Sequence, residues 1–346
     1  MYTPQTKFRA YIAFLISTLS IAGMATGCGA PQETKAAAST TMNVTHGETP
    51  LSVLYAGSMT HVMENDIRPA VNTTLHINLQ GEGAGSAELA HMITGKVADP
   101  DVFISASPSV DTNDLMGNAN GNAIRWYLTL ASDQLVIAYS PHSRFRSKFQ
   151  EAAQNKLPWY QVLATPGLRL GRTDPNLDPK GADTIVMMKL AEKLYHQPNL
   201  EQTLLGNDEN PKQVYPEEDL IAQLTSGQMD AVIAYKHEAI EWHVPYISLP
   251  SAINLGDPAD AQAYAKVAWQ PKHGKPIIGA PILFTITIPN RAPHPAAAAT
   301  FVRYMIHGQG HTMLMRDGFT ATKIEVGGDE AAVPQSLLST IQGKLS

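Results

Sequence analysis

Cysteine is almost absent from this 346-residue chain: Cys28 is the only one, which excludes an internal disulfide and a cysteine-based metal site. The histidines are scattered, and their spacing does not indicate a zinc site. No Gly-Lys-Ser or Gly-Lys-Thr follows a glycine-rich loop, so a nucleotide-binding P-loop is excluded. Internal repeats and coiled-coil heptads are missing as well.

Positive charge is also in short supply. Lys and Arg together number 25 against 31 Asp and Glu, and the formal net charge is −6. This balance argues against nucleic acid or an acidic membrane surface as a partner. An anionic ligand would have to be attracted by local dipoles and hydrogen-bond donors, and not by the field of the whole protein.

Residues 1–27 have the pattern of an export signal. Lys7 and Arg9 precede an apolar segment, 10–24, that is too short to span a membrane comfortably as a mature helix. Ala25-Thr26-Gly27-Cys28 is similar to the end of a bacterial lipoprotein signal, in which cleavage precedes the cysteine and lipid is attached to it. The alternative is that Cys28 is a buried structural thiol. Removal of residues 1–27 takes away two basic and no acidic residues, so the net charge becomes −8.

Residues 28–49 are rich in Ala, Thr, Ser and Gln without a large apolar periodicity, which predicts a flexible tether. The remaining stretch of roughly 300 residues is too long for one simple core and favours two lobes. Short apolar runs alternate with helical spacing, which indicates an α/β fold with mainly parallel sheets. The predicted elements are strands 51–55, 75–79, 101–106, 125–130, 134–139, 168–172, 231–235 and 281–288, and helices 61–70, 184–196, 216–225 and 295–307.

Two glycine–serine corners lie near the start of this fold. Gly57 and Ser58 follow the first strand, and Gly85 and Ser86 follow the second, each before a predicted helix. Free N–H groups and the dipole at a helix start attract anions, so the two corners could present hydroxyls and amides to one small oxyanion. The alternative is that Ser58 only caps its helix.

Several short motifs follow one another in an order that is found in a known family. They are Tyr55-Ala56-Gly57-Ser58, Trp126-Tyr127, Asn176-Leu177-Asp178-Pro179-Lys180-Gly181, Ala234-Tyr235-Lys236 and Ile253-Asn254-Leu255-Gly256-Asp257-Pro258. Together they resemble the molybdate/tungstate-binding proteins of ABC importers, closer to the tungstate-type branch than to the enterobacterial type. The resemblance covers about residues 51–319, and Asn-Leu-Gly-Asp-Pro and Asp-Pro-x-Gly are its more specific parts.

This resemblance implies a type II periplasmic-binding-protein fold, in which two hinged α/β lobes close around a fully ionised oxyanion. We expect lobe I to comprise 50–134 and 284–346 and lobe II to comprise 135–283, with strands 134–139 and 281–288 crossing between them. The ligand would be molybdate or tungstate, without a cofactor, and the partner would be a permease in the membrane. The protein is expected to be a monomer, held by lipid outside the cytoplasmic membrane of a bacterium.

The resemblance also implies an oxyanion site with contributions from both lobes. A dianion offers only acceptors, and hydroxyls with helix-start amides supply donors without a basic cluster. The expected ligand-binding residues are Ser58 and Ser86 from lobe I, and Asp178, Lys180, Tyr215 and Tyr235 from lobe II.

Some of these positions have plainer explanations. Asp178-Pro179 could be only a turn in which the aspartate caps the next helix, and Tyr235 could be a core residue. Trp126-Tyr127 indicates core or hinge packing. His237 and Glu238 either tune the cleft or belong to a solvated helix start.

Coordination of the metal is expected to differ from that in the tungstate-type branch, where two carboxylates reach the metal and expand its four oxygens towards six. Asp178 matches the first carboxylate, but this chain has Ala234 at the second position. Unless Glu238 or Glu218 supplies a ligand, we expect a nearly tetrahedral ion. Asp178 must then bind the metal, turn away or take up a proton.

The sequence therefore favours a binding protein over an enzyme. A binder of sulfate or another oxyanion is a rival of the same class. A membrane-tethered hydrolase with Ser58 or Ser86 as nucleophile is a rival of another class. Neither serine lies in Gly-x-Ser-x-Gly, neither begins Ser-x-x-Lys, and no histidine is an evident base.

Overall fold

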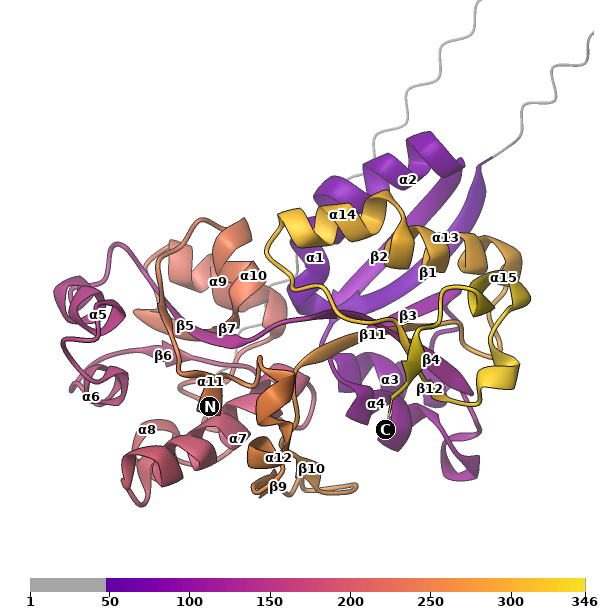
Figure 1. Cartoon of the computed structure of the whole chain (residues 1–346). Coiled ribbons are helices and arrows are strands. Elements are labelled where there is room, and N and C mark those ends of the chain that lie inside the picture. Colours follow the sequence, from indigo (N-terminus) through magenta and orange to yellow (C-terminus); the bar gives the residue numbers. More distant parts are fainter. Residues whose placement is uncertain (1–47, 346) are drawn as a thin grey trace, which may run out of the picture. The chain divides into compact units, whose positions relative to one another are not determined.

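The structure is a computed structural model and describes residues 48–345. Its strands form sheets of seven, four and two strands, in the orders β13-β12-β4-β11-β3-β1-β2, β6-β7-β5-β8 and β10-β9 (Figure 1). We call the residues around the seven-stranded sheet lobe I and those around the four-stranded sheet lobe II. The strands are β1 Thr49–Ala56, β2 Ile77–Ala84, β3 Val102–Ser105, β4 Trp126–Ser132, β5 Leu135–Tyr139, β6 Leu170–Gly171, β7 Ala231–Tyr235, β8 Tyr246–Ser248, β9 Ala268–Trp269, β10 Ile277–Ile278, β11 Leu283–Thr287, β12 Glu325–Gly328 and β13 Gly343–Lys344.

Helices cover both faces of the lobe I sheet (Figure 1). Leu54 and Phe103 pack with residues of α3 and α4 on one face, and Tyr55 and Ile104 belong to the core under α2 and α13 on the other. Such strands are apolar throughout because neither face meets water. The helices are α1 Thr60–Val62, α2 Arg68–Leu75, α3 Ser86–Thr94, α4 Pro108–Val110, α5 Arg146–Ala153, α6 Trp159–Leu163, α7 Pro179–Tyr195, α8 Leu200–Leu205, α9 Glu217–Thr225, α10 Lys236–Glu241, α11 Ser251–Asn254, α12 Ala261–Tyr264, α13 Pro295–His307, α14 Gln309–Arg316 and α15 Gln335–Leu338.

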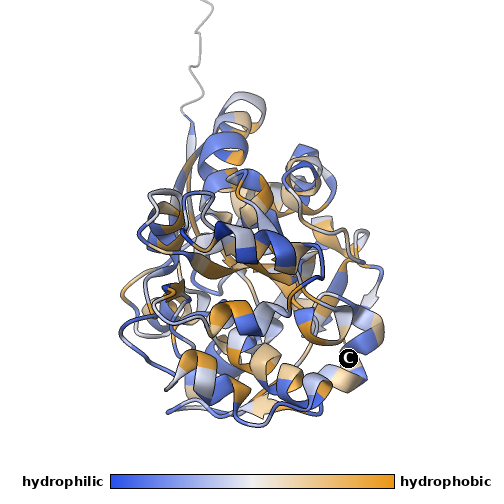
Figure 2. Cartoon of the chain, turned by 90° about the vertical axis from the view of Figure 1, so that its left-hand side faces the viewer, coloured by the Kyte–Doolittle hydropathy of each residue, from blue (hydrophilic) through white to orange (hydrophobic). Residues whose placement is uncertain are grey.

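Lobe II is built around the pair of strands β5 and β7. They run antiparallel, with Leu135 opposite Tyr235, and β6 pairs in parallel with β7. All residues of both strands are buried. The helices of this lobe carry both hydrophobic and hydrophilic residues (Figure 2). This composition is expected of helices that pack one face against a sheet and turn the other face to water.

The chain crosses between the two sheets at adjacent places. β4 ends at Ser132 and β5 begins at Leu135, so the first crossing is at Asp133 and Gln134. On the return, the Asp133 N–H donates to the carbonyl oxygen of Ile282 at 3.4 Å, and Ser132 lies opposite Leu283 in the ladder of β4 and β11. The hinge is predicted for these two segments.

Most predicted elements are confirmed, and β7 and α13 have the predicted bounds. The expectation of mainly parallel sheets is wrong, because six of the ten strand pairs within 48–345 are antiparallel. Two local predictions are wrong as well. The glycine-rich run before Ser86 belongs to β2 as far as Ala84, and α7 begins at Pro179, before the predicted start at 184. β1 begins at Thr49, the last residue of the predicted tether.

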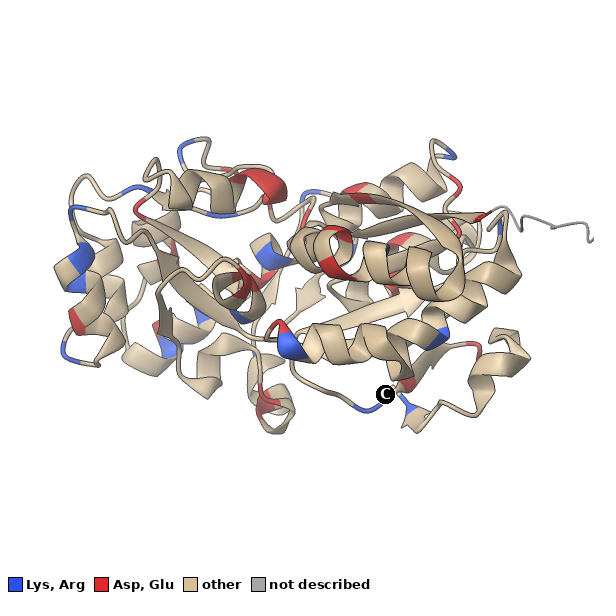
Figure 3. Cartoon of the chain, turned by 90° about the horizontal axis from the view of Figure 1, so that it is seen from above, with Lys and Arg blue, Asp and Glu red and all other residues tan. Residues whose placement is uncertain are grey.

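The export signal at 1–27, the lipidation site Cys28 and the rest of the tether lie outside the described residues. Within 48–345, no helix is both long and apolar enough to cross a membrane. Acidic and basic residues are scattered over both lobes (Figure 3).

Candidate functional site

The first serine corner leaves a hydroxyl free. Ser58 lies inside η1 (Gly57–Met59), a 3-10 turn that follows β1, and its side chain caps no helix. Its Oγ is buried and has no hydrogen-bond partner among the described residues. The interpretation of Ser58 as only a cap is therefore wrong.

Gly57 brings this corner against lobe II. A Cβ at residue 57 would lie 2.6 Å from Cγ of Glu217, the first residue of α9, so a larger residue would displace that side chain. Glu217 is itself buried, and its Oε2 also has no partner in the part of the chain that the structure describes. Two buried, unpaired polar atoms, one from each lobe, thus belong to residues at this contact.

The second serine corner is held by lobe II. Ser86 is the first residue of α3, and its Oγ accepts a hydrogen bond from the Ala106 N–H at 3.1 Å. The N–H groups of Ala87 and Glu88 donate to the carbonyl oxygen of Leu177 at 3.1 and 3.2 Å. A peptide carbonyl of lobe II therefore occupies the start of α3, while the Ser86 hydroxyl keeps its own proton for donation.

Lys180 is the centre of a buried charge cluster, which we define as Lys180, Glu217 and Glu238. Its Nζ donates to Glu217 Oε1 at 2.5 Å and to the two carboxylate oxygens of Glu238 at 2.9 and 2.8 Å. Glu238 also accepts a hydrogen bond from the Tyr235 N–H at 2.7 Å. An ammonium group has three protons, and these contacts use all of them.

One ammonium group cannot balance two buried carboxylates. Burial by itself would raise the pKa of Glu238, but Lys180 and His237 outweigh burial, so this pKa is lowered. For Glu217 burial dominates and raises the pKa well above its usual range. Glu238 has the two-oxygen contact and the additional N–H donor, so we assign the negative charge to Glu238 and a proton to Glu217.

Asp178 caps α7, as the turn interpretation predicts. Its Oδ1 accepts hydrogen bonds from the Lys180 N–H at 2.8 Å and from the Thr173 hydroxyl at 3.0 Å, and burial raises its pKa. The Tyr235 hydroxyl donates to Oδ2 of Asp183 at 3.4 Å. Burial, together with the nearby Asp178, raises the pKa of Asp183 to about 8. Sequence reasoning missed Asp183 because an aspartate inside a helix usually faces water.

The remaining predicted positions are Tyr215, Ala234, Glu218 and Glu238. The Tyr215 N–H donates to the carbonyl oxygen of Arg172 at 3.0 Å, and its ring packs against the lobe II core. Ala234 is fully buried in β7. Glu218 is exposed, and Glu238 is held in the buried charge cluster by Lys180.

His237 connects the first serine corner to the crossing between the sheets. Its Nδ1 faces Oδ2 of Asp133 at 2.5 Å, and its Nε2 faces the carbonyl oxygen of Ser58 at 3.0 Å. Burial alone would lower the pKa of His237, but Asp133 raises it to about 9. The imidazolium donates to both oxygens. The interpretation of His237 and Glu238 as a solvated helix start is therefore wrong.

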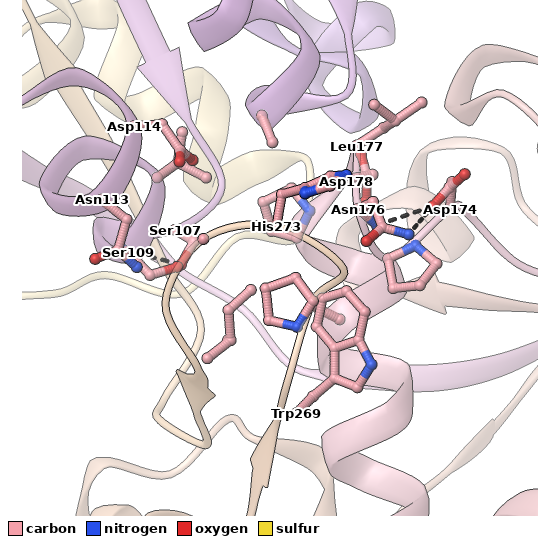
Figure 4. A pocket seen from close by; sticks show the side chains of 18 of the residues that line it. Ser107, Ser109, Asn113, Asp114, Asp174, Asn176, Leu177, Asp178, Trp269 and His273 are labelled. Atoms are coloured by element: carbon pink, nitrogen blue, oxygen red, sulfur yellow. Dashed lines mark hydrogen bonds between the residues drawn. The ribbon is translucent and has the colours of Figure 1, made fainter. Parts of the chain in front are cut away.

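A cavity of about 450 Å³ adjoins Asp178 between the lobes. Figure 4 shows Ser107 and Asp114 on one side of it and Asp174 and Asp178 on the other. Ser58, Ser86 and Tyr235 do not line this cavity, but Ala87, the neighbour of Ser86, and Asp183, the partner of the Tyr235 hydroxyl, do. Within residues 48–345, no cluster of three or more His, Cys, Asp or Glu residues is arranged to hold a metal ion.

Known proteins resemble this chain in sequence and in structure. The family model of bacterial extracellular solute-binding proteins matches residues 51–320. A protein of Haloferax volcanii with the name "Putative ABC transporter molybdenum-binding protein" is 34% identical over 270 residues, 78% of this chain and 81% of that protein. The molybdate/tungstate-binding protein WtpA of Thermococcus kodakarensis is 27% identical over 329 residues, 88% of this chain and 89% of that protein.

A solved structure supports the fold. The periplasmic molybdate-binding protein of Azotobacter vinelandii superimposes with a TM-score of 0.53 at 15% identity, over 79% of this chain and 99% of its own. This likeness confirms the predicted periplasmic-binding-protein fold of two α/β lobes. The likenesses in sequence confirm the resemblance that the short motifs predict.

Proposed function

Because the chain belongs to the family of bacterial extracellular solute-binding proteins, we propose that it binds molybdate or tungstate between its lobes and delivers the ion to an ABC permease. Its relatives in Haloferax volcanii and Thermococcus kodakarensis carry molybdenum or molybdate/tungstate binding in their names. In this proposal the chain is a binding protein and needs no cofactor.

The observation that carries the proposal is the Ser58 hydroxyl. It is buried where the lobes meet and has no partner among residues 48–345, although buried polar groups are nearly always hydrogen-bonded. A dianion, which offers only acceptors, is the complementary ligand for such a donor. We assign the ion to the hydroxyls of Ser58, Ser86 and Tyr235, with Asp178 and the backbone near Lys180 and Tyr215 around it. In this proposal the Tyr235 hydroxyl exchanges its long 3.4 Å bond to Asp183 for the ion.

Asp178 must be compatible with a dianion beside it. Burial raises its pKa, and a proton taken up by this carboxyl group together with the ion would remove the repulsion. Ala234 provides no second carboxylate. We therefore propose that the ion keeps four oxygens and a nearly tetrahedral geometry.

We also propose the attachment and the layout of the chain. The family description supports a location outside the cytoplasm, where lipid on Cys28 would anchor the protein after removal of 1–27, with 28–49 as tether. Lobe I would comprise 50–134 and 284–346, lobe II 135–283, and the protein would act as a monomer.

Two other functions remain as alternatives to be tested. A sulfate binder would use the same donors and would differ only in ligand size. A serine hydrolase requires a base at the nucleophile. His237, however, faces the Ser58 carbonyl oxygen, and in the described residues no histidine contacts the hydroxyl of Ser58 or Ser86.

Thermal unfolding of the mature protein with added molybdate, tungstate, sulfate or phosphate tests the proposal. A ligand at about 100 times its dissociation constant stabilises the folded state by about 2.7 kcal/mol. We expect molybdate and tungstate to raise the melting temperature clearly more than phosphate. Equal melting temperatures with all four anions would refute the function if calorimetric titration with molybdate and tungstate also detects no heat of binding. A selective response to sulfate would establish the rival binder.

A further inference from the structure

Glu217 has one carboxylate oxygen in use and one that is free. Oε1 accepts from Lys180 Nζ at 2.5 Å, whereas Oε2 is buried without a partner among the residues described. The side chain lies against Gly57, whose added Cβ would be 2.6 Å from Glu217 Cγ. Ser58, the next residue, carries the other unpaired buried oxygen of this contact.

The described residues offer Glu217 one cation, Lys180, which it shares with Glu238. Lys180 faces it from α7 and Asp178 from the cap of that helix, and Glu238 and Tyr235 face it from α10 and β7. The turn η1 contributes no charged side chain, and Glu82 is the only charged residue of the neighbouring β2.

The single ammonium group is therefore matched by Glu238, which accepts from it with both oxygens and from a backbone N–H as well. An ionised Glu217 would add an unbalanced negative charge beside the place assigned to a dianion. A proton on the free oxygen Oε2 removes this charge and turns the oxygen into a donor.

We propose that Glu217 is a neutral carboxylic acid that donates a hydrogen bond from Oε2 to the bound oxyanion, next to the hydroxyl of Ser58. This inference rests on the function proposed above. It makes oxyanion affinity depend on the proton of Glu217 in addition to that of Asp178: the contribution of Glu217 to affinity is constant below its pKa in the free protein and falls about tenfold per pH unit above it.

The proton is tested first without any ligand. We compare infrared spectra of the mature parent protein, Glu217→Gln and the control Glu218→Gln, which changes the exposed neighbour of Glu217. At pH 7 the parent and Glu218→Gln should show more carboxylic-acid C=O absorption than Glu217→Gln, because Asp183, whose pKa is raised to about 8, absorbs in all three proteins and only the contribution of Glu217 is lost. The band should move to lower frequency when molybdate is added. Equal carboxylic-acid absorption in all three proteins, with no difference band between the parent and Glu217→Gln, would show that the proton is not on Glu217 and would overturn the inference.

Calorimetric titration with molybdate from about pH 6 to pH 10 tests the donor. Glu217→Gln keeps an N–H donor that does not titrate. Its affinity for molybdate at low pH should therefore lie within about threefold of the parent's, and it should not show the decrease in affinity at high pH that the parent shows. Glu217→Ala lacks the donor and should bind about 10- to 100-fold more weakly at low pH. His237 and Asp183 also titrate in this range, but they do so in every variant, so only the difference from the parent is used.

The outcomes separate this inference from the proposed function. If the parent binds molybdate and Glu217→Gln loses affinity at high pH to the same extent, the donor role is overturned and the function is left intact. Unchanged affinity in Glu217→Ala would also overturn it. A parent that binds neither molybdate nor tungstate at any pH would refute the function and the donor role together, whatever the infrared spectra show about the proton.

Discussion

Lys180→Met tests the buried charge cluster by removing its only cation. Glu217 and Glu238 would remain buried without an ammonium group, although Lys180 now contacts both at 2.5 to 2.9 Å. Removal of one partner from a buried ion pair costs about 3–5 kcal/mol of unfolding free energy. Methionine fills much of the same volume, so the loss of charge should dominate over the loss of packing.

The effect of pH on this loss has a definite sign. The pKa of Glu238 is lowered in the folded parent, so its stabilisation is present above the unfolded pKa and is lost as pH falls through the lower folded pKa. In Lys180→Met the uncompensated carboxylate of Glu238 becomes neutral when it is protonated, so acidification relieves the variant. The difference in unfolding free energy between parent and variant should therefore shrink from pH 7 towards about pH 4.

Urea unfolding followed by circular dichroism at both pH values gives the measurement. Lys193→Met on the same helix is the control, because Lys193 is exposed, and it should stay within about 0.5 kcal/mol of the parent. The double variant Lys180→Met/Glu238→Gln should regain part of the loss. The reasoning would be refuted if Lys180→Met had the same unfolding free energy as Lys193→Met at pH 7. It would also be refuted if the difference in unfolding free energy between parent and Lys180→Met grew on acidification.

Three further predictions concern the ligand. Ser58→Ala and Ser86→Ala each remove a donor to a buried dianion and should weaken molybdate binding about 10- to 100-fold in calorimetric titration; the control Ser226→Ala, at an exposed position, should not. X-ray absorption on the complex should show four short metal–oxygen distances, since Ala234 leaves no second carboxylate. Small-angle scattering should show a smaller radius of gyration with saturating molybdate, because the two crossings between the sheets form the expected hinge.

Contrary results would be equally clear. Parent-like affinity in both serine variants would place the site elsewhere. Two additional, longer oxygen neighbours at the metal would exclude the tetrahedral ion. An unchanged scattering profile with bound ligand would argue against closure.

Much of the fold could be predicted from the sequence because it depends on local patterns. β3, β4 and β7 are apolar runs that need cover on both faces, and α13 is an alanine-rich helix after a proline. Asp178 followed by proline predicts a cap, and its side chain does cap α7. Each of these features is decided by neighbours within a few positions along the chain.

The free hydroxyl of Ser58 could not be predicted, because whether a serine caps its helix depends on the exact path of the turn. The buried charge cluster was equally hidden: Glu217 is followed by Glu218 and Asp219, which is the usual composition of a solvated helix start. Only the tertiary structure brings Lys180, Glu217 and Glu238 together and buries them. The ionisation of a carboxylate depends on its burial and on its nearest charges, and for these residues those charges come from segments far apart in the sequence.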